Sequence, residues 1–369
     1  MAYTTIDDPS AYFQTALYAG NNTTDHNITN DGNSDLQPDF VWIKQRNSDN
    51  PHVLHDTSRG FNGAGLGYNL QTNSTAIEGT NGAFESFNTN GFGVGGTNVA
   101  SGAYNLSGSN YVAWQWKANG GTTSNLSGNL DSVVQVNADA GFSIVKYTGS
   151  GGNGQSVLHG LGLTPEVIIT KARNGVDNWY VYHKSIGNTK ILKLNTDAAE
   201  ASSSVYSAAA VNSTAFFVST NLIYVGELGA DFISYCFAPI QGYSKFGKYI
   251  GNGSGTSDGT FDGPFVHTGF KPAWVMVKRT SYSAGDGWTL WDNKRPRANS
   301  TGNYINNKLN PASASAESGD VYDAVDFLSN GFKLRTGRGG ANANGSTYTY
   351  MAFAENPFVT STGTPTTAR

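Results

Sequence analysis

The same series of short segments occurs three times along the chain, and this repetition constrains the fold more than any other feature. In each copy a proline precedes an apolar run that ends in a lysine, at residues 38–44, 165–171 and 272–278. The lysines are roughly 130 and then 105 residues apart, which is too long for a solenoid repeat and suits a small β domain. The sequence therefore predicts three tandem units built on one pattern.

Further landmarks surround each proline segment in the same order. Each unit opens with an aromatic run that leads into a glycine, and later has a second strand-like run, a small-residue stretch, a turn into an apolar strand, and a closing aromatic strand. The opening runs are 13–18, 142–147 and 243–249; the second runs are 52–56, 179–183 and 288–292; the small-residue stretches are 73–76, 195–199 and 310–314; the apolar strands are 90–94, 214–218 and 330–334; the closing strands are 111–116, 232–237 and 348–353. This shared order is typical of duplication.

The character of these runs predicts an all-β fold. They are short, aromatic and β-branched, and clusters of Gly, Asn, Asp and Ser separate them; Gly alone accounts for 46 of 369 residues. A helical period is visible only at residues 198–211. We expect three tandem antiparallel β-sandwich domains of the jelly-roll type, with a β-propeller as the alternative.

Composition changes place the domain boundaries. The predicted units are residues 1–118, 141–240 and 241–359, with a Gly/Ser/Thr/Asn linker at 119–140 and a flexible tail at 360–369. The long linker predicts a loose joint after the first unit, whereas residues 239–242 leave almost no linker between the second and third.

Charge and cysteine content exclude several classes of function. The net charge is −4, which argues against electrostatic capture of nucleic acid or acidic membrane. No apolar stretch reaches the roughly 18 residues of a membrane helix, and the N-terminus lacks the pattern of a signal peptide, so we expect synthesis in a cytoplasm. The single cysteine, Cys236, lies in an apolar run and predicts a buried, inert thiol.

Enzyme motifs are present only by chance. Residues 255–259 match a nucleophile elbow, and residues 149–154 match a dinucleotide fingerprint, but no helix-forming run follows either. The closely spaced carboxylates of a glycosidase strand are absent, and Glu227 and Asp231 border a turn. We therefore predict no catalytic residue and no enzyme activity.

Metal sites and repeated polar residues have mostly structural interpretations. Asn252, Asp258 and Asp262 share a glycine-rich loop and carry oxygens that suit calcium, the one cofactor that the sequence suggests, although turn formation is the favoured explanation of these residues. The sequence pattern places His55 and His183 at equivalent positions, with Trp291 in the third unit, and the change from His to Trp argues against a shared metal site. Residues Lys44, Lys171 and Lys278 are expected to pair with a carboxylate or a loop carbonyl.

Aromatic residues are the remaining candidates for binding. Trp and Tyr combine an apolar face with a polar tip and are frequent in recognition surfaces. Sugar rings stack on such faces, although packing in the core explains each residue as well. The six candidates are Trp114, Trp116, Trp179, Tyr182, Trp288 and Trp291.

Several segments together resemble virion structural proteins of marine tailed phages, including cyanophages. The segments that carry the resemblance are residues 5–15, 111–117, 159–162, 242–246 and 353–358, so it covers nearly the whole chain. The resemblance implies tandem lectin-like, concanavalin-like sandwich domains in a tail-fibre or capsid-decorating protein. It implies no catalytic motif, and it accounts for the absence of disulfides because virions assemble in the host cytoplasm.

The resulting hypothesis is a non-enzymatic virion protein, either a tail-fibre or receptor-binding adhesin for host-surface glycans. The alternatives are a decoration or architectural protein that contacts only other virion subunits, and a polysaccharide-degrading tail enzyme. The expected partners are other virion proteins and a host glycan, with homo-oligomerisation and without nucleic acid or membrane insertion.

Overall fold

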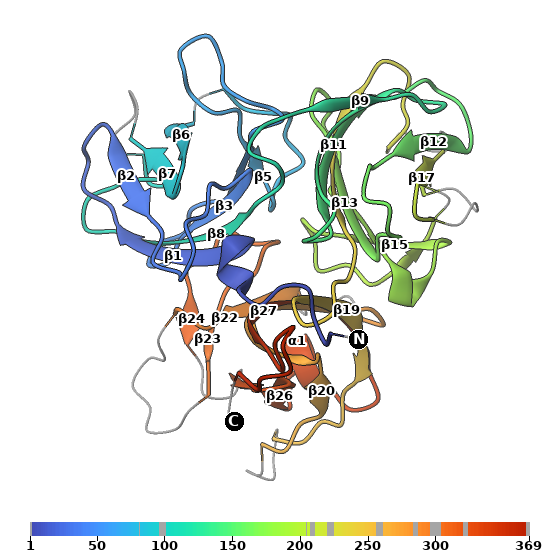
Figure 1. Ribbon diagram of the computed structural model, residues 1–369. Coiled ribbons are helices and arrows are strands. Elements are labelled where there is room, and N and C mark those ends of the chain that lie inside the picture. The colour runs from blue at the N-terminus through green and yellow to red at the C-terminus, as the bar shows by residue number, and fades with distance from the viewer. Residues whose placement is uncertain are drawn as a thin grey trace.

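Three β-rich lobes surround a common centre in the computed structural model of the chain (Figure 1). The structure describes residues 2–80, 82–95, 101–203, 205–206, 211–219, 225–255, 261–282, 287–295, 304–319 and 324–366. The lobes follow the sequence repeats, which we call repeat 1 (residues 1–118), repeat 2 (119–240) and repeat 3 (241–359). The all-β prediction is confirmed.

Strands are the main regular elements of each repeat. Repeat 1 contains β1 (Phe13–Ala19), β2 (His26–Thr29), β3 (Phe40–Gln45), β4 (Val53–Asp56), β5 (Leu70–Gln71), β6 (Phe84–Asn88), β7 (Gly91–Val94) and β8 (Asn110–Trp116). Repeat 2 contains β9 (Ser124–Leu126), β10 (Ser132–Asn137), β11 (Phe142–Thr148), β12 (Gln155–Leu158), β13 (Val167–Ala172), β14 (Tyr180–His183), β15 (Lys190–Lys193), β16 (Ala201–Ser202), β17 (Ala215–Val218) and β18 (Asp231–Phe237). Repeat 3 contains β19 (Ser244–Ile250), β20 (Phe265–His267), β21 (Phe270–Arg279), β22 (Trp288–Asp292), β23 (Asn307–Lys308), β24 (Ser318–Gly319), β25 (Ala324–Leu328), β26 (Gly331–Arg335) and β27 (Thr347–Pro357).

Helices are few and short among the described residues: η1 (Pro9–Ala11), η2 (Lys184–Ile186) and α1 (Gly339–Asn342). The segment 198–211, where a helical period was noted, contributes only β16 to the described elements. Residues 204 and 207–210 of that segment lie outside the described part of the chain.

Each repeat places its opening strand beside its closing strand in a large antiparallel sheet. The strand orders are β1-β8-β3-β4-β5 in repeat 1, β11-β18-β13-β14-β15 within the larger sheet of repeat 2, and β19-β27-β21-β22 in repeat 3. A smaller sheet accompanies each one: β2-β7-β6, β12-β17 and β20-β26-β25. This order is sandwich-like and differs from the sequential order of strands expected in a propeller blade.

The closing strands are buried on both faces, which explains their apolar sequences. In β8, Tyr111 and Ala113 pack between the two sheets of repeat 1. The alternate residues Val112, Trp114 and Trp116 point the other way, into a cluster that includes residues from all three repeats. We call this cluster the shared core.

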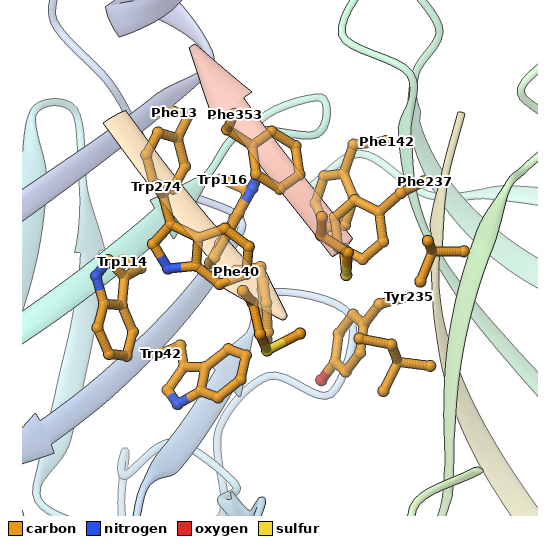
Figure 2. Close-up of a cluster of buried hydrophobic side chains, with 14 of the residues drawn as sticks. Phe13, Phe40, Trp42, Trp114, Trp116, Phe142, Tyr235, Phe237, Trp274 and Phe353 are labelled. Carbon is orange, nitrogen blue, oxygen red and sulfur yellow. The ribbon is translucent and has the colours of Figure 1, made fainter. Parts of the chain in front are cut away.

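Three equivalent aromatic residues meet inside the shared core (Figure 2). Trp116, Phe237 and Phe353 occupy the same register in their closing strands, opposite Phe40, Val167 and Trp274 respectively. Their ring centroids are 6.4 Å (Trp116–Phe237), 5.6 Å (Trp116–Phe353) and 5.8 Å (Phe237–Phe353) apart. Each repeat therefore contributes one ring to a mutual contact at the centre.

A glycine ends each opening strand because the chain passes very close to a neighbouring carbonyl. A Cβ atom at Gly20, Gly149 or Gly251 would lie 2.2, 2.1 or 2.3 Å from a backbone oxygen. The three glycine N–H groups donate to equivalent carbonyls, those of Ser109, Ala230 and Ser346. The repeated glycine of the sequence is thus a steric requirement.

Equivalent backbone hydrogen bonds join the repeats in a closed ring. Glu78 N–H of repeat 1 donates to the Arg173 carbonyl of repeat 2 at 2.7 Å. Glu200 of repeat 2 donates to Thr280 of repeat 3 at 2.8 Å, and Glu317 of repeat 3 donates to Arg46 of repeat 1 at 2.7 Å. The three repeats therefore contact one another in the same way around the centre.

Ion pairs reinforce two of these three junctions. The Glu78 carboxylate accepts from Arg173 of repeat 2 at 2.8 Å, and the Glu317 carboxylate accepts from Arg46 of repeat 1 at 2.9 Å. Glu200 instead pairs with Lys190 of its own repeat, because the opposite residue is the uncharged Thr280.

The predicted linker at 119–140 is wrong in its central part. Residues 124–126 and 132–137 form β9 and β10, which extend the sheet of repeat 2 next to β11. In β10, Val134 packs between the sheets of repeat 2 and Gln135 is fully buried. The loose joint expected after repeat 1 is therefore replaced by paired strands, since the alternating Val residues suit a half-buried strand.

Truncation of the central tryptophan tests whether the repeats unfold together. Trp116→Ala should lower the free energy of unfolding by about 3–5 kcal/mol and should weaken all three repeats, because the ring touches residues from each. Thermal unfolding with hydrogen exchange would measure this, with the exposed Phe61→Ala as the control. Loss of protection confined to repeat 1 would contradict a shared core.

Neutralising a junction glutamate tests the ion pairs. Glu317→Gln should destabilise the chain by about 3 kcal/mol, because Arg295, whose side chain is fully buried, loses one of its two carboxylate partners. The control Glu166→Gln removes a pair with the exposed Lys184 and should cost under about 0.5 kcal/mol in urea unfolding. Equal effects of the two substitutions would refute the importance of the junction.

Candidate functional site

The six aromatic residues predicted as sugar-stacking platforms all lie inside the protein. None is more than 6 % exposed: they are Trp114, Trp116, Trp179, Tyr182, Trp288 and Trp291. Since a stacked sugar needs an open ring face, the ligand-binding assignment is corrected, and packing in the core explains these residues.

Several of these rings also connect the repeats through their indole N–H groups. Trp179 of repeat 2 donates to the Gln71 carbonyl of repeat 1 at 2.8 Å, and Trp288 of repeat 3 donates to the Lys193 carbonyl of repeat 2 at 2.9 Å. Trp114 of repeat 1 donates to the Asp292 carboxylate of repeat 3 at 3.0 Å. Their polar tips therefore hold the ring of repeats together.

Two of the three calcium candidates use their oxygens within the protein. The Asn252 side-chain oxygen accepts from Ser254 N and from Asn342 Nδ2, and Asp262 forms an ion pair with Lys333 at 2.6 Å. Asp258 lies outside the described residues. Within the described ranges, no group of three or more His, Cys, Asp or Glu side chains could hold a metal ion.

The strand registers correct the expected equivalence of the histidines. His55 is equivalent to Tyr182 and Trp291, because these residues face Val41, Ile168 and Val275 of the proline strands. His183 is instead equivalent to Asp56 and Asp292. Both histidines are buried, and burial lowers the pKa of each, to about 4 for His183.

Each histidine has a structural partner. His55 stacks on Phe84 with centroids 4.3 Å apart, and its Nε2 lies 3.1 Å from the Tyr104 hydroxyl. The Nε2 of His183 lies 3.1 Å from the Tyr350 carbonyl of repeat 3. Both imidazoles are buried and packed against their neighbours.

The repeated lysines bind loop carbonyls, as predicted. Lys44 Nζ donates to the carbonyls of Gln45 and Ser48, and Lys171 Nζ donates to those of Ala172 and Gly175. Lys278 Nζ donates to its neighbour's carbonyl and to that of Asp197 in repeat 2. Burial lowers the pKa of both Lys44 and Lys171 to about 8. Cys236 is likewise buried and free, and burial raises the pKa of its thiol.

Open space occurs in two places on the described surface. A polar cavity of about 480 Å³ in repeat 3 is lined by Lys308, Asn310, Ser313, Ser315 and Arg338, among others. A hollow of about 220 Å³ lies between repeats 1 and 3, and a hollow of about 240 Å³ lined by repeat 3 adjoins it through Asn293 and Glu355. We call these two adjoining hollows the interrepeat groove.

The interrepeat groove is polar and its charges are balanced. Repeat 1 contributes Phe13, Gln14, Thr15 and Asp31, and repeat 3 contributes Asn293, Lys294, Ala354, Glu355 and others. Lys294 pairs with Asp31 across the groove at 2.9 Å, and Lys271 pairs with Glu355 at 3.0 Å. A bound group would therefore meet amides, hydroxyls and paired charges.

Thr15 stands out among the groove residues. Its side chain is 4 % exposed, and its Oγ1 has no hydrogen-bond partner. The residues at the same register in repeats 2 and 3 are Ile144 and Phe246, which both pack in the shared core. Sequence reasoning missed Thr15; aligning the opening strands residue by residue would have shown a lone hydroxyl among apolar equivalents.

The low pKa of the buried lysines predicts how stability depends on pH. Between the folded pKa of about 8 and the ordinary value of 10.5, the unfolded chain binds more protons than the folded one. Stability should therefore rise as pH increases from 8 to about 9. Above this pH the buried tyrosines and Cys236, whose pKa values are raised by burial, ionise first in the unfolded chain and oppose the rise. Lys171→Met should reduce this rise in urea unfolding, and the exposed-lysine control Lys184→Met should not. A flat profile in the native chain would contradict the assignment.

Comparisons with known proteins give one family. Neither the curated proteins nor the solved structures provide a match. No helix of the described residues is long and apolar enough to cross a membrane. One family model matches residues 8–357, which covers nearly all of the three repeats. The chain belongs to the family described as a domain of unknown function, DUF7483.

Proposed function

We propose that the chain is a non-enzymatic structural protein of a tailed-phage virion. The observation that carries this proposal is the fusion of three sandwich-like repeats through one shared core and a closed ring of junctions. Such a body resists deformation, because each repeat is fixed by two neighbours. The resemblance of the sequence to marine phage virion proteins supplies the setting, with lectin-like jelly-roll repeats as the fold variant.

The architectural role, in which the chain contacts other virion subunits, is the better supported form of this proposal. The aromatic residues that suggested glycan recognition are buried and pack inside the protein. Large buried side chains such as Trp116 and Trp274 stabilise the body and contribute nothing to its outer surface. The virion location and copy number, including homo-oligomerisation, belong to the proposal.

A role as a glycan-binding adhesin is a second candidate, and one observation favours it. The cavity in repeat 3 is lined by the amide of Asn310 and the hydroxyls of Ser313, Ser315 and Ser318. Neutral amides and hydroxyls are suited to the hydroxyl groups of a saccharide, and low-affinity sites would gain from many copies on a virion. The polysaccharide-degrading alternative has less support, because the described residues that line this cavity include no carboxylate.

Immunogold labelling of intact virions distinguishes these roles. An antibody against the chain should label the head surface or the tail tube if the role is architectural, and should label the tail tip if the chain is an adhesin. Incubation with host envelope polysaccharide should release no reducing ends in either case. Virions without any label would overturn the proposed location, and released reducing ends would overturn the non-enzymatic assignment.

A further inference from the structure

The opening strand of repeat 1 lacks the second neighbouring strand that its equivalent in repeat 2 has. β1 is the terminal strand of its sheet, with β8 as its neighbour. β11, the equivalent strand of repeat 2, lies between β18 and β10. The outer side of a terminal strand carries backbone groups that have no partner within the sheet, and another extended segment can pair with them.

β10 does more than cover the edge of β11, because it also fills the junction with repeat 1. Gln135 lies opposite Ile144, and its side-chain oxygen accepts from Thr57 of repeat 1 at 2.6 Å. Asn137 lies opposite Phe142, and its amide donates to the Lys117 carbonyl of repeat 1 at 3.5 Å. β10 therefore lies between β11 of repeat 2 and the residues Thr57 and Lys117 of repeat 1.

The corresponding positions at the junction between repeats 1 and 3 line the interrepeat groove. Thr15 and Phe13 are equivalent to Ile144 and Phe142, since they take the same register against the closing strands. Asn293 follows Asp292 as Thr57 follows Asp56, so Asn293 is equivalent to Thr57. Ala354 follows Phe353 as Lys117 follows Trp116, so Ala354 is equivalent to Lys117. All four residues line the groove. The groove thus occupies the place that β10 fills in the junction between repeats 1 and 2.

The polar groups of the groove are suited to binding a polar, uncharged segment. The buried hydroxyl of Thr15 has no partner within the chain. The charged groups around it, Lys294 with Asp31 and Lys271 with Glu355, already neutralise each other. A segment with an amide side chain opposite Thr15, as Gln135 is opposite Ile144, would supply a hydrogen-bond partner without adding charge.

We propose that the interrepeat groove binds an extended, uncharged peptide segment of a partner polypeptide, which pairs with the outer edge of β1 as β10 pairs with β11. This mode of recognition uses backbone hydrogen bonds for affinity and alternate side-chain positions for selectivity. The inference goes beyond the proposed function and holds whether or not the chain is part of a virion.

A synthetic peptide with the sequence of residues 132–137, Ser-Val-Val-Gln-Val-Asn, blocked at both ends, is the probe. Titrated into the full-length chain, it should slow hydrogen exchange of β1 amides in a saturable manner. A peptide with Lys in place of Gln should bind at least about tenfold more weakly, because it places an unpaired charge in the groove.

Two pairs of variants locate the binding. Asn293→Trp fills the groove and should weaken peptide binding at least about tenfold, whereas Asn344→Trp, on an exposed residue of the same repeat outside the groove, should leave it unchanged. Thr15→Val should weaken binding several-fold without loss of thermal stability, because it removes a hydroxyl that has no partner. Thr349→Val removes another buried hydroxyl without a partner, away from the groove, and should not alter binding.

Three results would overturn the inference. The first is unchanged exchange in β1 at the highest soluble peptide concentration, and the second is equal binding by Asn293→Trp and the native chain. The third is a pair of observations: oligosaccharides from host envelope slow hydrogen exchange around Asn293 and Glu355, and the peptide does not slow exchange in β1. This result would assign the groove to a saccharide. Immunogold labelling of virions tests the proposed function independently of peptide binding. Failure of the peptide to bind would therefore not contradict the proposed function.

Discussion

The mutual packing of Trp116, Phe237 and Phe353 is the contact on which the rest of the structure depends. A sheet that is apolar on one face can be covered by a single partner, but the large sheets here are apolar on both faces. The smaller sheet of each repeat covers one face. Only the other repeats can cover the second, and so the three repeats are held together by the hydrophobic effect.

The junctions around this core have the same design but different strengths. The carboxylates of Glu78 and Glu317 each pair with arginine side chains of two repeats, whereas Glu200 pairs only within repeat 2. Residues at one position also diverge in chemistry, as Asp56, Asp292 and His183 do. Duplication thus conserved the backbone contacts while individual side chains acquired different partners.

Much of the fold could be predicted from the sequence because its signals are local. Alternation, turn residues and the order of landmarks were enough for the all-β class and the repeats. The role of residues such as Trp114 could not be predicted, because a two-sided buried strand and a strand with an exposed aromatic face have the same sequence pattern. The same limit applies to β10, whose Val residues are surrounded by a Gly- and Ser-rich stretch typical of a linker. The groove could be found only from the positions that are equivalent in three dimensions. The sequence comparison misaligned His55 and His183 by one residue, which shows that this equivalence is difficult to assign without a structure.

Because the shared core is built from residues of all three repeats, no repeat has a complete core of its own. Expression of residues 119–240 alone tests it most directly, because this segment contains both sheets of repeat 2 and lacks the cover that Trp116 and Phe353 provide. The isolated repeat should show no cooperative thermal transition and should bind a hydrophobic dye strongly, since Ile144, Val167 and Phe237 would be exposed to water. A monomeric segment that unfolds cooperatively without dye binding would contradict the account, and would make the three repeats independent domains.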